Sequence, residues 1–239
     1  MLECVLKERG RMPRLGTRKL KHRMAMQGMY SGRDWLFALL RRNGLLIKPL
    51  RSYTKTTYSK HWLKKYSNLI KDKQVSAPNQ VWVSDITYIK TDEGFNYLSL
   101  VTDKFSRKIV GYDLSEDLKA EGTIRALEMA VKEESFQPGL IHHSDRGLQY
   151  CSHEYQRLLG SNEIRPSMTE QSDPYENALA ERMNGILKTE FFLEGGFPNT
   201  QIALLAVQEA IETYNSIRPH LSLNLRTPVE VHKKTNPQS

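Results

Sequence analysis

Cysteine and long apolar runs are both scarce in this chain of 239 residues. Its two cysteines, Cys4 and Cys151, lie far apart, and neither belongs to a C-x-x-C pair. That spacing argues against a disulfide framework or a zinc site and fits a reducing cytoplasm. No apolar run approaches the ~20 residues that a membrane-spanning helix needs. The N-terminus, MLECVLKERGRMPR, lacks the apolar stretch of a signal peptide, so we expect a protein with no membrane partner.

Positive charge is concentrated in the first third of the chain. Residues 1–80 hold 19 Lys and Arg against 4 Asp and Glu, a net charge of +15. Residues 81–239 hold 16 Lys and Arg against 23 Asp and Glu, a net charge of −7. This asymmetry indicates that a basic part of the chain binds a polyanion and that a separate part has a different function. An ordinary solvated surface is the alternative, but the concentration of charge favours nucleic acid.

Two short basic helices are expected near the N-terminus. The first covers residues 17–27, TRKLKHRMAMQ. The second is predicted after Ser31, whose spacing to Asp34 is that of a capping box. Gly44 provides the stop signal of this second helix, directly after a basic last turn.

Two short helices joined by a glycine-containing turn are typical of a helix-turn-helix. We therefore predict that residues 1–50 bind DNA and that Arg41 and Arg42 contact it, with a merely basic helical hairpin as the alternative. Residues 51–77 mix basic residues with aromatics and are assigned as a linker. Such a composition suits either contact with phosphates and unstacked bases or packing against a neighbouring domain. Residues 78–236 are predicted to form the main domain.

The pattern changes to strands at residue 81. The predicted strands cover residues 81–90, 96–103, 108–115, 140–143 and 163–168. The predicted helices cover residues 119–134, 153–160, 175–192 and 200–217, with a loop at 169–174. The first three strands have tight connections and predict an antiparallel meander. This order of elements is typical of an α/β fold in which helices flank a mixed sheet.

Two acidic residues stand out by their positions, one within a strand and one just after a strand. Asp85 interrupts an otherwise apolar strand, where strand propensity and burial both disfavour it. Asp145 follows a short strand in HHSDRG, where Gly147 permits a sharp turn. Ligands of α/β proteins gather at such strand ends. Taken alone, either residue is more often a simple turn or edge residue.

A third acidic residue, Glu181, lies on a polar face of the helix predicted at 175–192. It is rotated by roughly 200° from Leu179, which belongs to the apolar stripe of that helix. The polar face carries, at helical spacing, Asn177, Glu181, Asn184 and Lys188. The helix therefore has one face for the core and one for a polar cleft, although a lone Glu on a helix usually faces solvent.

Converging carboxylates repel one another, at a cost of about 4 kcal/mol for a pair ~4 Å apart in a dielectric near 20. Such a cluster takes up protons or binds a divalent cation. Oxygen ligands without a thiolate cluster favour Mg²⁺, with Mn²⁺ as a substitute. Two such ions would stabilise the attacking and leaving oxygens of a phosphoryl displacement. The neighbouring His142 and His143 are expected to pack inside the fold rather than bind metal.

Three motifs contain these acidic residues: WVSDITYI, HSDRGLQY and PYENALAERMNGILKTE. Together they resemble the DDE catalytic core of retroviral integrases and bacterial transposases. Between Asp145 and Glu181 lie 35 residues, a spacing characteristic of the orfB-type transposases of the insertion-sequence-three family. YNSIRPHLSL and TPVEVH resemble the C-terminal signature of that family, and GRDWLFALLRRNGLL resembles its N-terminal helix-turn-helix. The resemblance covers nearly the whole chain.

The resemblance implies an RNase H-like fold in which Asp85, Asp145 and Glu181 are the catalytic metal ligands. It implies a DNA transposase that binds element ends, cleaves a strand with water, and transfers the freed 3′-hydroxyl into target DNA. Lys188 is similar to the basic residue that family members place near the scissile phosphate. The candidate DNA-contacting residues are Lys188, Asn177, Asn184, Arg41 and Arg42.

The family also implies protein partners. Its active enzyme is usually a fusion with an upstream reading frame, which supplies end-specific binding and a zipper, and it works as a multimer on paired DNA ends. We therefore expect a homo-oligomer on DNA, a partnership or fusion with the upstream product, and a location at the bacterial nucleoid. Two alternatives remain open: a nuclease of the same fold that cuts without joining, and a non-catalytic DNA-binding regulator built on the basic N-terminal part.

Overall fold

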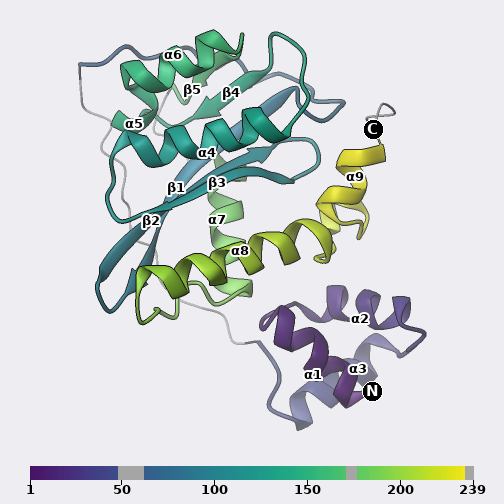
Figure 1. Ribbon diagram of the computed structural model, residues 1–239. Coiled ribbons are helices and arrows are strands. Elements are labelled where there is room, and N and C mark those ends of the chain that lie inside the picture. The colour runs from purple at the N-terminus through teal and green to yellow at the C-terminus, as the bar shows by residue number, and fades with distance from the viewer. Residues whose placement is uncertain (48–61, 171–176, 235–239) are drawn as a thin grey trace.

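The computed structural model describes residues 1–47, 62–170 and 177–234, and its centre is a five-stranded sheet in the order β3-β2-β1-β4-β5 (Figure 1). The strands are β1 (Val81–Thr91), β2 (Gly94–Asp103), β3 (Ile109–Ser115), β4 (Ile141–Ser144) and β5 (Arg165–Met168). Strands β1 to β3 form an antiparallel meander. Strand β4 pairs in parallel with both β1 and β5. The predicted mixed sheet and its meander are confirmed.

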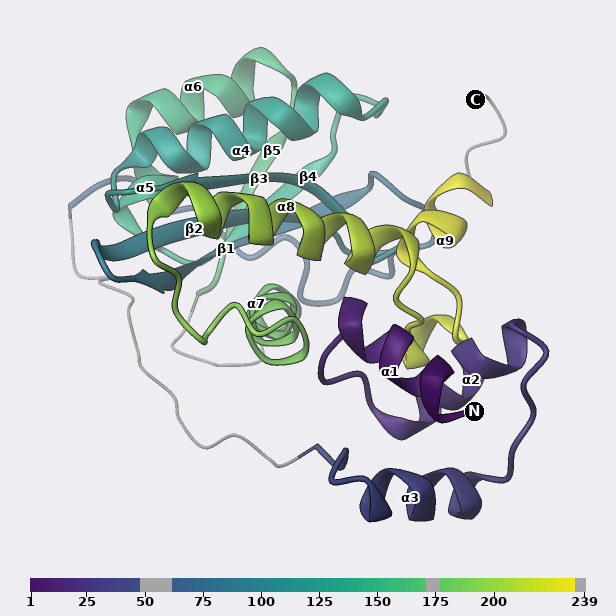
Figure 2. The ribbon, with the colours of Figure 1, turned by 60° about the horizontal axis from the view of Figure 1, so that its bottom comes forward.

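Helices cover both faces of the sheet, as the edge-on view in Figure 2 shows. On one face lie α4 (Ala120–Glu133), α5 (Leu148–Cys151) and α6 (His153–Ser161). On the other face lie α7 (Ala178–Glu190) and α8 (Thr200–Ser216). No helix in the described ranges is both long and apolar enough to cross a membrane.

The two larger apolar clusters of the described residues follow from the alternation of side chains along the strands. Trp82, Val101 and Val110 belong to the cluster that α4 and α6 cover. Ile89 and Leu98 belong to the cluster that α7 and α8 cover. The sheet is therefore buried on both sides.

Three helices precede the sheet: α1 (Leu2–Arg11), α2 (Thr17–Met26) and α3 (Arg33–Arg42). The second and third confirm the two predicted helices, whereas α1 was not predicted. The capping box predicted from Ser31 and Asp34 is wrong, because Gly32 is the N-cap and Asp34 pairs with Arg33 at 2.9 Å. Gly44 follows α3 with a φ of 66°, as the predicted stop signal requires.

The N-terminal helices are anchored to the end of α7 at Glu190. Lys19 Nζ donates to Glu190 Oε1 at 2.6 Å, and Arg218 donates to both carboxylate oxygens at 2.8 Å. The backbone N–H of Arg14 donates to the carbonyl of Glu190 at 3.1 Å. Apolar residues of α1, α2 and α3 also belong to the same buried cluster as those of α7 and α8. The N-terminal helices are therefore packed on the core and not only tethered to it.

The predicted linker lies partly outside the described residues, which exclude 48–61; of the predicted loop at 169–174, only the first two residues are described. Residues 62–77 carry no helix or strand. Ile70 is buried in an apolar cluster with the start of β1, and the backbone N–H of Leu69 donates to a side chain of β5 at 2.9 Å. For residues 62–77, the structure therefore shows packing against the neighbouring domain, which was one of the two alternatives.

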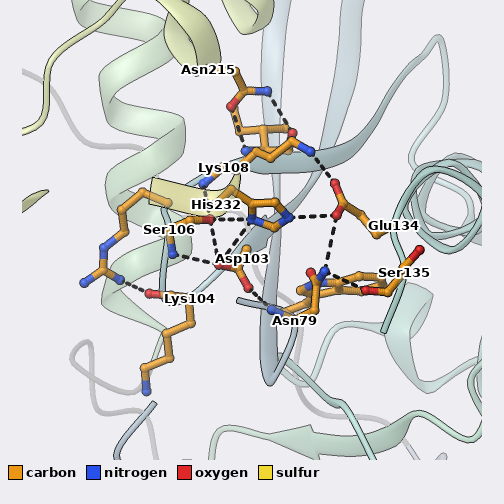
Figure 3. A network of polar contacts seen from close by, with 12 residues as sticks. Asn79, Asp103, Lys104, Ser106, Lys108, Glu134, Ser135, Asn215 and His232 are labelled. Carbon is orange, nitrogen blue, oxygen red and sulfur yellow. Dashed lines mark hydrogen bonds and ion pairs between the residues drawn. The ribbon is translucent and has the colours of Figure 1, made fainter. Parts of the chain in front are cut away.

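The C-terminal part comprises η1 (Leu221–Leu223) and α9 (Pro228–Lys234), and a buried polar network ties α9 to the sheet (Figure 3). His232 Nε2 lies 2.8 Å from Glu134 Oε2, and its Nδ1 lies 2.9 Å from Ser106 Oγ. Asp103 accepts from the N–H and hydroxyl of Ser106 at 2.7 Å and from the N–H of Asn79 at 2.8 Å. Because these buried groups satisfy one another, the network fixes the β2–β3 turn relative to α9.

Candidate active site

Asp85 and Asp145 are brought together by the parallel pairing of β1 and β4. Val83 lies opposite His143 in this pair, and each chain then continues for two residues in the same direction. Asp85 and Asp145 consequently line one cavity of about 290 Å³. The same cavity is bounded by β1, β2 and the start of α5, so it opens at the carboxyl end of β4. This is the strand end at which the sequence predicted a site.

Glu181 joins them from the first turn of α7, where its side chain is exposed. Burial and then the charge of Asp145 raise the pKa of Glu181. Burial, then Asp145, and more weakly Glu181, raise the pKa of Asp85 to about 7. The charge of Asp145 therefore acts on both other carboxyl groups, although Glu181 does not line the cavity that Asp85 and Asp145 share.

Two asparagines of α7 hold β1 in place. Asn184 Nδ2 donates to Asp85 Oδ2 at 2.8 Å, and Asn177 Nδ2 donates to the carbonyl of Ser84 at 3.2 Å. Both asparagines are at most 6% exposed, because α7 lies directly across β1 and buries part of its own polar face. Neither amide is available to DNA in this arrangement, which corrects the contact that the resemblance implied. Their hydrogen bonds instead fix β1 and, through Asn184, orient the carboxyl group of Asp85.

The loop after β4 orients Asp145. The N–H of Gly147 donates to Asp145 Oδ1 at 2.9 Å. Gly147 was expected to permit a sharp turn, but its φ of −65° is open to any residue, so the backbone conformation does not require glycine here. A Cβ at this position would lie 3.0 Å from Asp145 Oδ1, so the missing side chain is what lets the backbone approach the carboxylate.

The histidines behind the site are packing residues, as predicted. His142 Nε2 lies 2.7 Å from Ser84 Oγ and 2.9 Å from the hydroxyl of Tyr155, and burial lowers the pKa of His142 to about 3. His143 Nδ1 lies 2.9 Å from Ser167 Oγ. These bonds join β1, β4, β5 and α6 and keep the strand ends that carry the aspartates in register.

The predicted basic DNA contacts lie in two regions. Lys188 of α7 places its Nζ 3.6 Å from the centroid of the Tyr88 ring, and Tyr88 lines the cavity with Asp85. Burial lowers the pKa of Lys188. Arg41 and Arg42 are exposed at the end of α3. Tyr88 itself was not singled out from the sequence, because an aromatic residue in a strand is ordinary.

The donor set fits a hard divalent cation, although the ligands are not fully gathered. Within the described ranges, no three His, Cys, Asp or Glu side chains already form a metal-binding group. Burial and then the charge of Asp145 raise the pKa of both Asp85 and Glu181, and a bound cation would oppose both effects. The buried Oδ1 of Asn184, next to Asp85, has no partner among the described residues. Asp85 and Asp145, which line one cavity, have the oxygen ligands that such a cation prefers.

Comparison with known proteins shows the family of this chain. Two family profiles, both described as "Integrase core domain", match residues 75–174 and residues 162–228. The "Insertion element IS600 uncharacterized 31 kDa protein" of Shigella sonnei is 38% identical over 221 residues, covering 92% of this chain and 81% of its own. "Transposase InsF for insertion sequence IS3A" of Escherichia coli (strain K12) is 36% identical over 209 residues, covering 87% and 73%.

Solved structures share the fold. A chain of the simian T-cell lymphotropic virus intasome, in complex with a PP2A regulatory subunit, matches with a TM-score of 0.59 at 20% identity, over 92% of this chain and 72% of its own. The HTLV-2 integrase catalytic core domain in complex with magnesium matches with a TM-score of 0.52 at 22% identity, over 65% and 97%. The five-stranded sheet and its flanking helices are thus those of the integrase core.

Proposed function

Since the chain belongs to the insertion-sequence-three family of transposases, we propose that Asp85, Asp145 and Glu181 are its catalytic residues. A transposase with an integrase core is a polynucleotidyl transferase that cleaves DNA and transfers strands, so its substrate is DNA. The observation that carries the proposal is that Asp85 and Asp145 line one cavity, while the charge of Asp145 also acts on Glu181 of α7.

The three carboxylates would hold divalent ions, with Mg²⁺ as the natural ion, Mn²⁺ as a substitute and two ions per site. When bound, such ions supply Lewis-acid stabilisation to both the attacking and the leaving oxygen of a phosphoryl displacement. The magnesium in the HTLV-2 integrase core supports this choice of ion. Asn184 and the backbone N–H of Gly147 fix the two aspartates in the orientation that metal ligation needs.

DNA contacts are assigned to the basic residues on the two surfaces. Lys188, beside the cavity wall, would meet a phosphate close to the scissile bond, as its counterpart in the family does. Arg41 and Arg42 would hold DNA further from the site. Asn184 and Asn177 act instead as positioning residues for β1.

Assembly on DNA follows from the class of enzyme. The likeness to an intasome chain supports a homo-oligomer on paired element ends. A fusion with the upstream reading-frame product, or a complex with it, would add end-specific binding. The site of action is then the bacterial chromosome, at the nucleoid.

The test uses the full-length protein, labelled ends of its own element, target DNA and Mg²⁺. We expect cleaved and joined products, and Asp145→Asn or Glu181→Gln should lower their rate by at least ~10³-fold while DNA binding persists. Glu154→Gln, on the exposed surface of α6, is the matched control and should keep full activity. Cleaved products without joined strands would favour the nuclease alternative. Full activity of both active-site variants would favour the regulator and remove the proposed site.

A further inference from the structure

A second cavity, of about 380 Å³, lies beside the turn that connects β2 and β3. Basic residues reach it from the segment before β1, from the turn itself and from the stretch before α9. They are Lys73, Lys104, Arg107 and Arg226. No Asp or Glu is among the described residues that line this cavity. The site therefore presents positive charge from three separate parts of the chain.

These four cations lack direct acidic partners in the described parts of the chain, since none takes part in an ion pair there. Burial and then repulsion by Arg107 lower the pKa of Lys104. Burial also lowers the pKa of Arg107, although the charge of Asp103 acts in the opposite direction. An anion in the cavity would relieve this uncompensated positive charge.

The turn that carries Lys104 and Arg107 is fixed by hydrogen bonds of the buried polar network. The network in Figure 3 binds both ends of this turn through Asp103 and Ser106, while Lys104 points its amino group away from the network. Arg107 adopts a φ of 66°, which is uncommon for a residue with a side chain. The hydroxyl of Tyr214 donates to the carbonyl of Arg107 at 2.9 Å and helps to hold it there. The cations are thus arranged before any ligand arrives.

Positive charge continues from this cavity towards α7, the helix that carries Glu181. The charge of Arg182 in α7 acts on Arg107, and Arg182 is exposed next to Glu181. The N–H of Lys104 also donates to the carbonyl of Val81 at 2.8 Å, at the beginning of β1. Asp85 lies four residues further along that strand, or about 13 Å at ~3.3 Å per residue. That distance corresponds to about four nucleotides along one DNA strand.

We propose that this cavity is a second DNA-binding site, in which Lys73, Lys104, Arg107 and Arg226 hold a backbone phosphate a few nucleotides from the scissile bond. The position along the DNA rests on the proposed active site, whereas the binding of a phosphate does not. The site contacts the backbone only, so it adds affinity and register without reading sequence. A free phosphate ion has the same chemistry and is distinguished in the experiment.

The first measurement compares two full-length double variants. Lys73→Gln/Lys104→Gln removes two cavity charges without touching the positive-φ residue or the polar network. Lys132→Gln/Arg157→Gln removes two exposed charges from α4 and α6 and is the matched control. Binding of a labelled duplex is measured over a range of salt concentrations. The cavity variant should flatten the slope of log K against log salt by about 1 to 2, and the control should change it much less. Equal slopes for the two variants would overturn the proposal.

The second measurement places the DNA. Lys104→Cys is labelled with a photoreactive phenyl azide and irradiated with a duplex that contains the element end. The native Cys4 and Cys151 are buried, and the labelled wild-type protein measures their background cross-linking. We expect cross-links a few nucleotides from the cleaved bond, whereas Lys132→Cys should give none. Cross-linking no stronger than at position 132 would overturn the proposal. Combining Lys104→Cys with Asp145→Asn separates the proposed phosphate site from the proposed active site. Cross-linking should persist in this variant while cleavage stops. Cleavage that persists would refute only the catalytic assignment.

A third measurement uses inorganic phosphate as the ligand. Phosphate alone could raise the melting temperature of the wild-type protein but not of Lys73→Gln/Lys104→Gln, while both proteins bind DNA equally well. In that case the cavity is a site for a small anion, and the DNA proposal is overturned. If phosphate competes with the duplex for the wild-type protein only, the cavity and the DNA backbone share one site, as proposed.

Discussion

Asn184 donates a hydrogen bond of 2.8 Å to the carboxyl group of Asp85 and so joins α7 to the middle of β1. Asp85 is buried and repelled by Asp145, and this bond is one of the few interactions that favour its charged form. Helix α7 therefore has two tasks in the active site. It carries Glu181, and it fixes the orientation of a carboxyl group on a strand that it crosses.

Replacing Asn184 by alanine should lower strand-transfer activity about 10- to 100-fold, the usual effect of removing a group that orients a metal ligand. The variant should also need more Mg²⁺ for half-maximal activity, because Asp85 loses a donor that stabilises its carboxylate. Single-turnover rates over a Mg²⁺ titration measure both effects. Asn162→Ala removes a side-chain bond at the end of α6 and is the control. An unchanged Mg²⁺ requirement in Asn184→Ala would mean that the bond serves only to pack α7 on β1.

Much of the fold could be read from the sequence because its elements are strongly periodic. The strand that carries Asp85 and the helix that carries Glu181 both begin and end within three residues of their predicted bounds. The alternation of a strand and the 3.6-residue repeat of a helix are local properties, so a single segment is enough to reveal them. Asp85 was singled out for a related reason, since an acidic residue within an apolar strand conflicts with local propensity, but its catalytic role stays a prediction.

What escaped prediction depends on how elements meet. Helical spacing correctly placed Asn184 on the same face as Glu181, but it could not show that this part of the face packs on β1. The basic cavity is built from Lys73, Lys104 and Arg226, which lie in three segments far apart in sequence. The polar network around His232 likewise joins distant segments. Such tertiary contacts leave no periodic mark in a single sequence.

The anchor of the N-terminal helices gives a prediction about stability. Glu190→Gln should lower the free energy of unfolding by about 2–4 kcal/mol, because Lys19 and Arg218 would remain buried without a counter-charge. Their side chains are 12% and 3% exposed, so water compensates only a small part of the loss. Urea unfolding at neutral pH measures the change. Glu194→Gln is the control, because Glu194 is 34% exposed and lies 3.6 Å from Arg14, and its loss should cost at most about 1 kcal/mol. Similar losses for the two variants would contradict a special role of Glu190.

The network at α9 gives a prediction about pH. Burial alone would raise the pKa of Glu134, but the hydrogen bonds from His232 and Lys108 lower it to about 2. A depressed carboxyl pKa means stability that is present above the ordinary pKa and is lost as the pH falls through the lowered one. Glu134→Gln should therefore lower the free energy of unfolding by about 1–3 kcal/mol at pH near 7, and this difference should shrink between about pH 4.5 and 2.

The measurement for Glu134 is the difference in unfolding free energy between wild type and variant over that pH range. Taking the difference removes the contribution of the other carboxyl groups, which titrate in the same window. Glu133→Gln changes the neighbouring exposed residue of α4 and is the control. A difference that is independent of pH would show that the ionisation of Glu134 does not stabilise the network.

The basic N-terminal part gives a prediction about DNA binding. If the whole chain neutralises about six phosphates, log K against log salt should fall with a slope near −5. Deleting the N-terminal residues would not test this cleanly, because α1, α2 and α3 share a buried cluster with α7 and α8. Point variants avoid that problem. Arg41→Gln/Arg42→Gln removes two exposed charges from the end of α3 and should flatten the slope by about 2.

The control for α3 is Lys7→Gln/Arg11→Gln, which removes two exposed charges from α1 in the same basic part of the chain. If α3 is the element that meets DNA, the control should change the slope by much less than Arg41→Gln/Arg42→Gln. Both variants carry the same net charge, so a general electrostatic attraction would affect them equally. Equal slopes would therefore assign binding to the overall charge of residues 1–80, whereas a difference confined to α3 would place the DNA backbone beside Arg41 and Arg42.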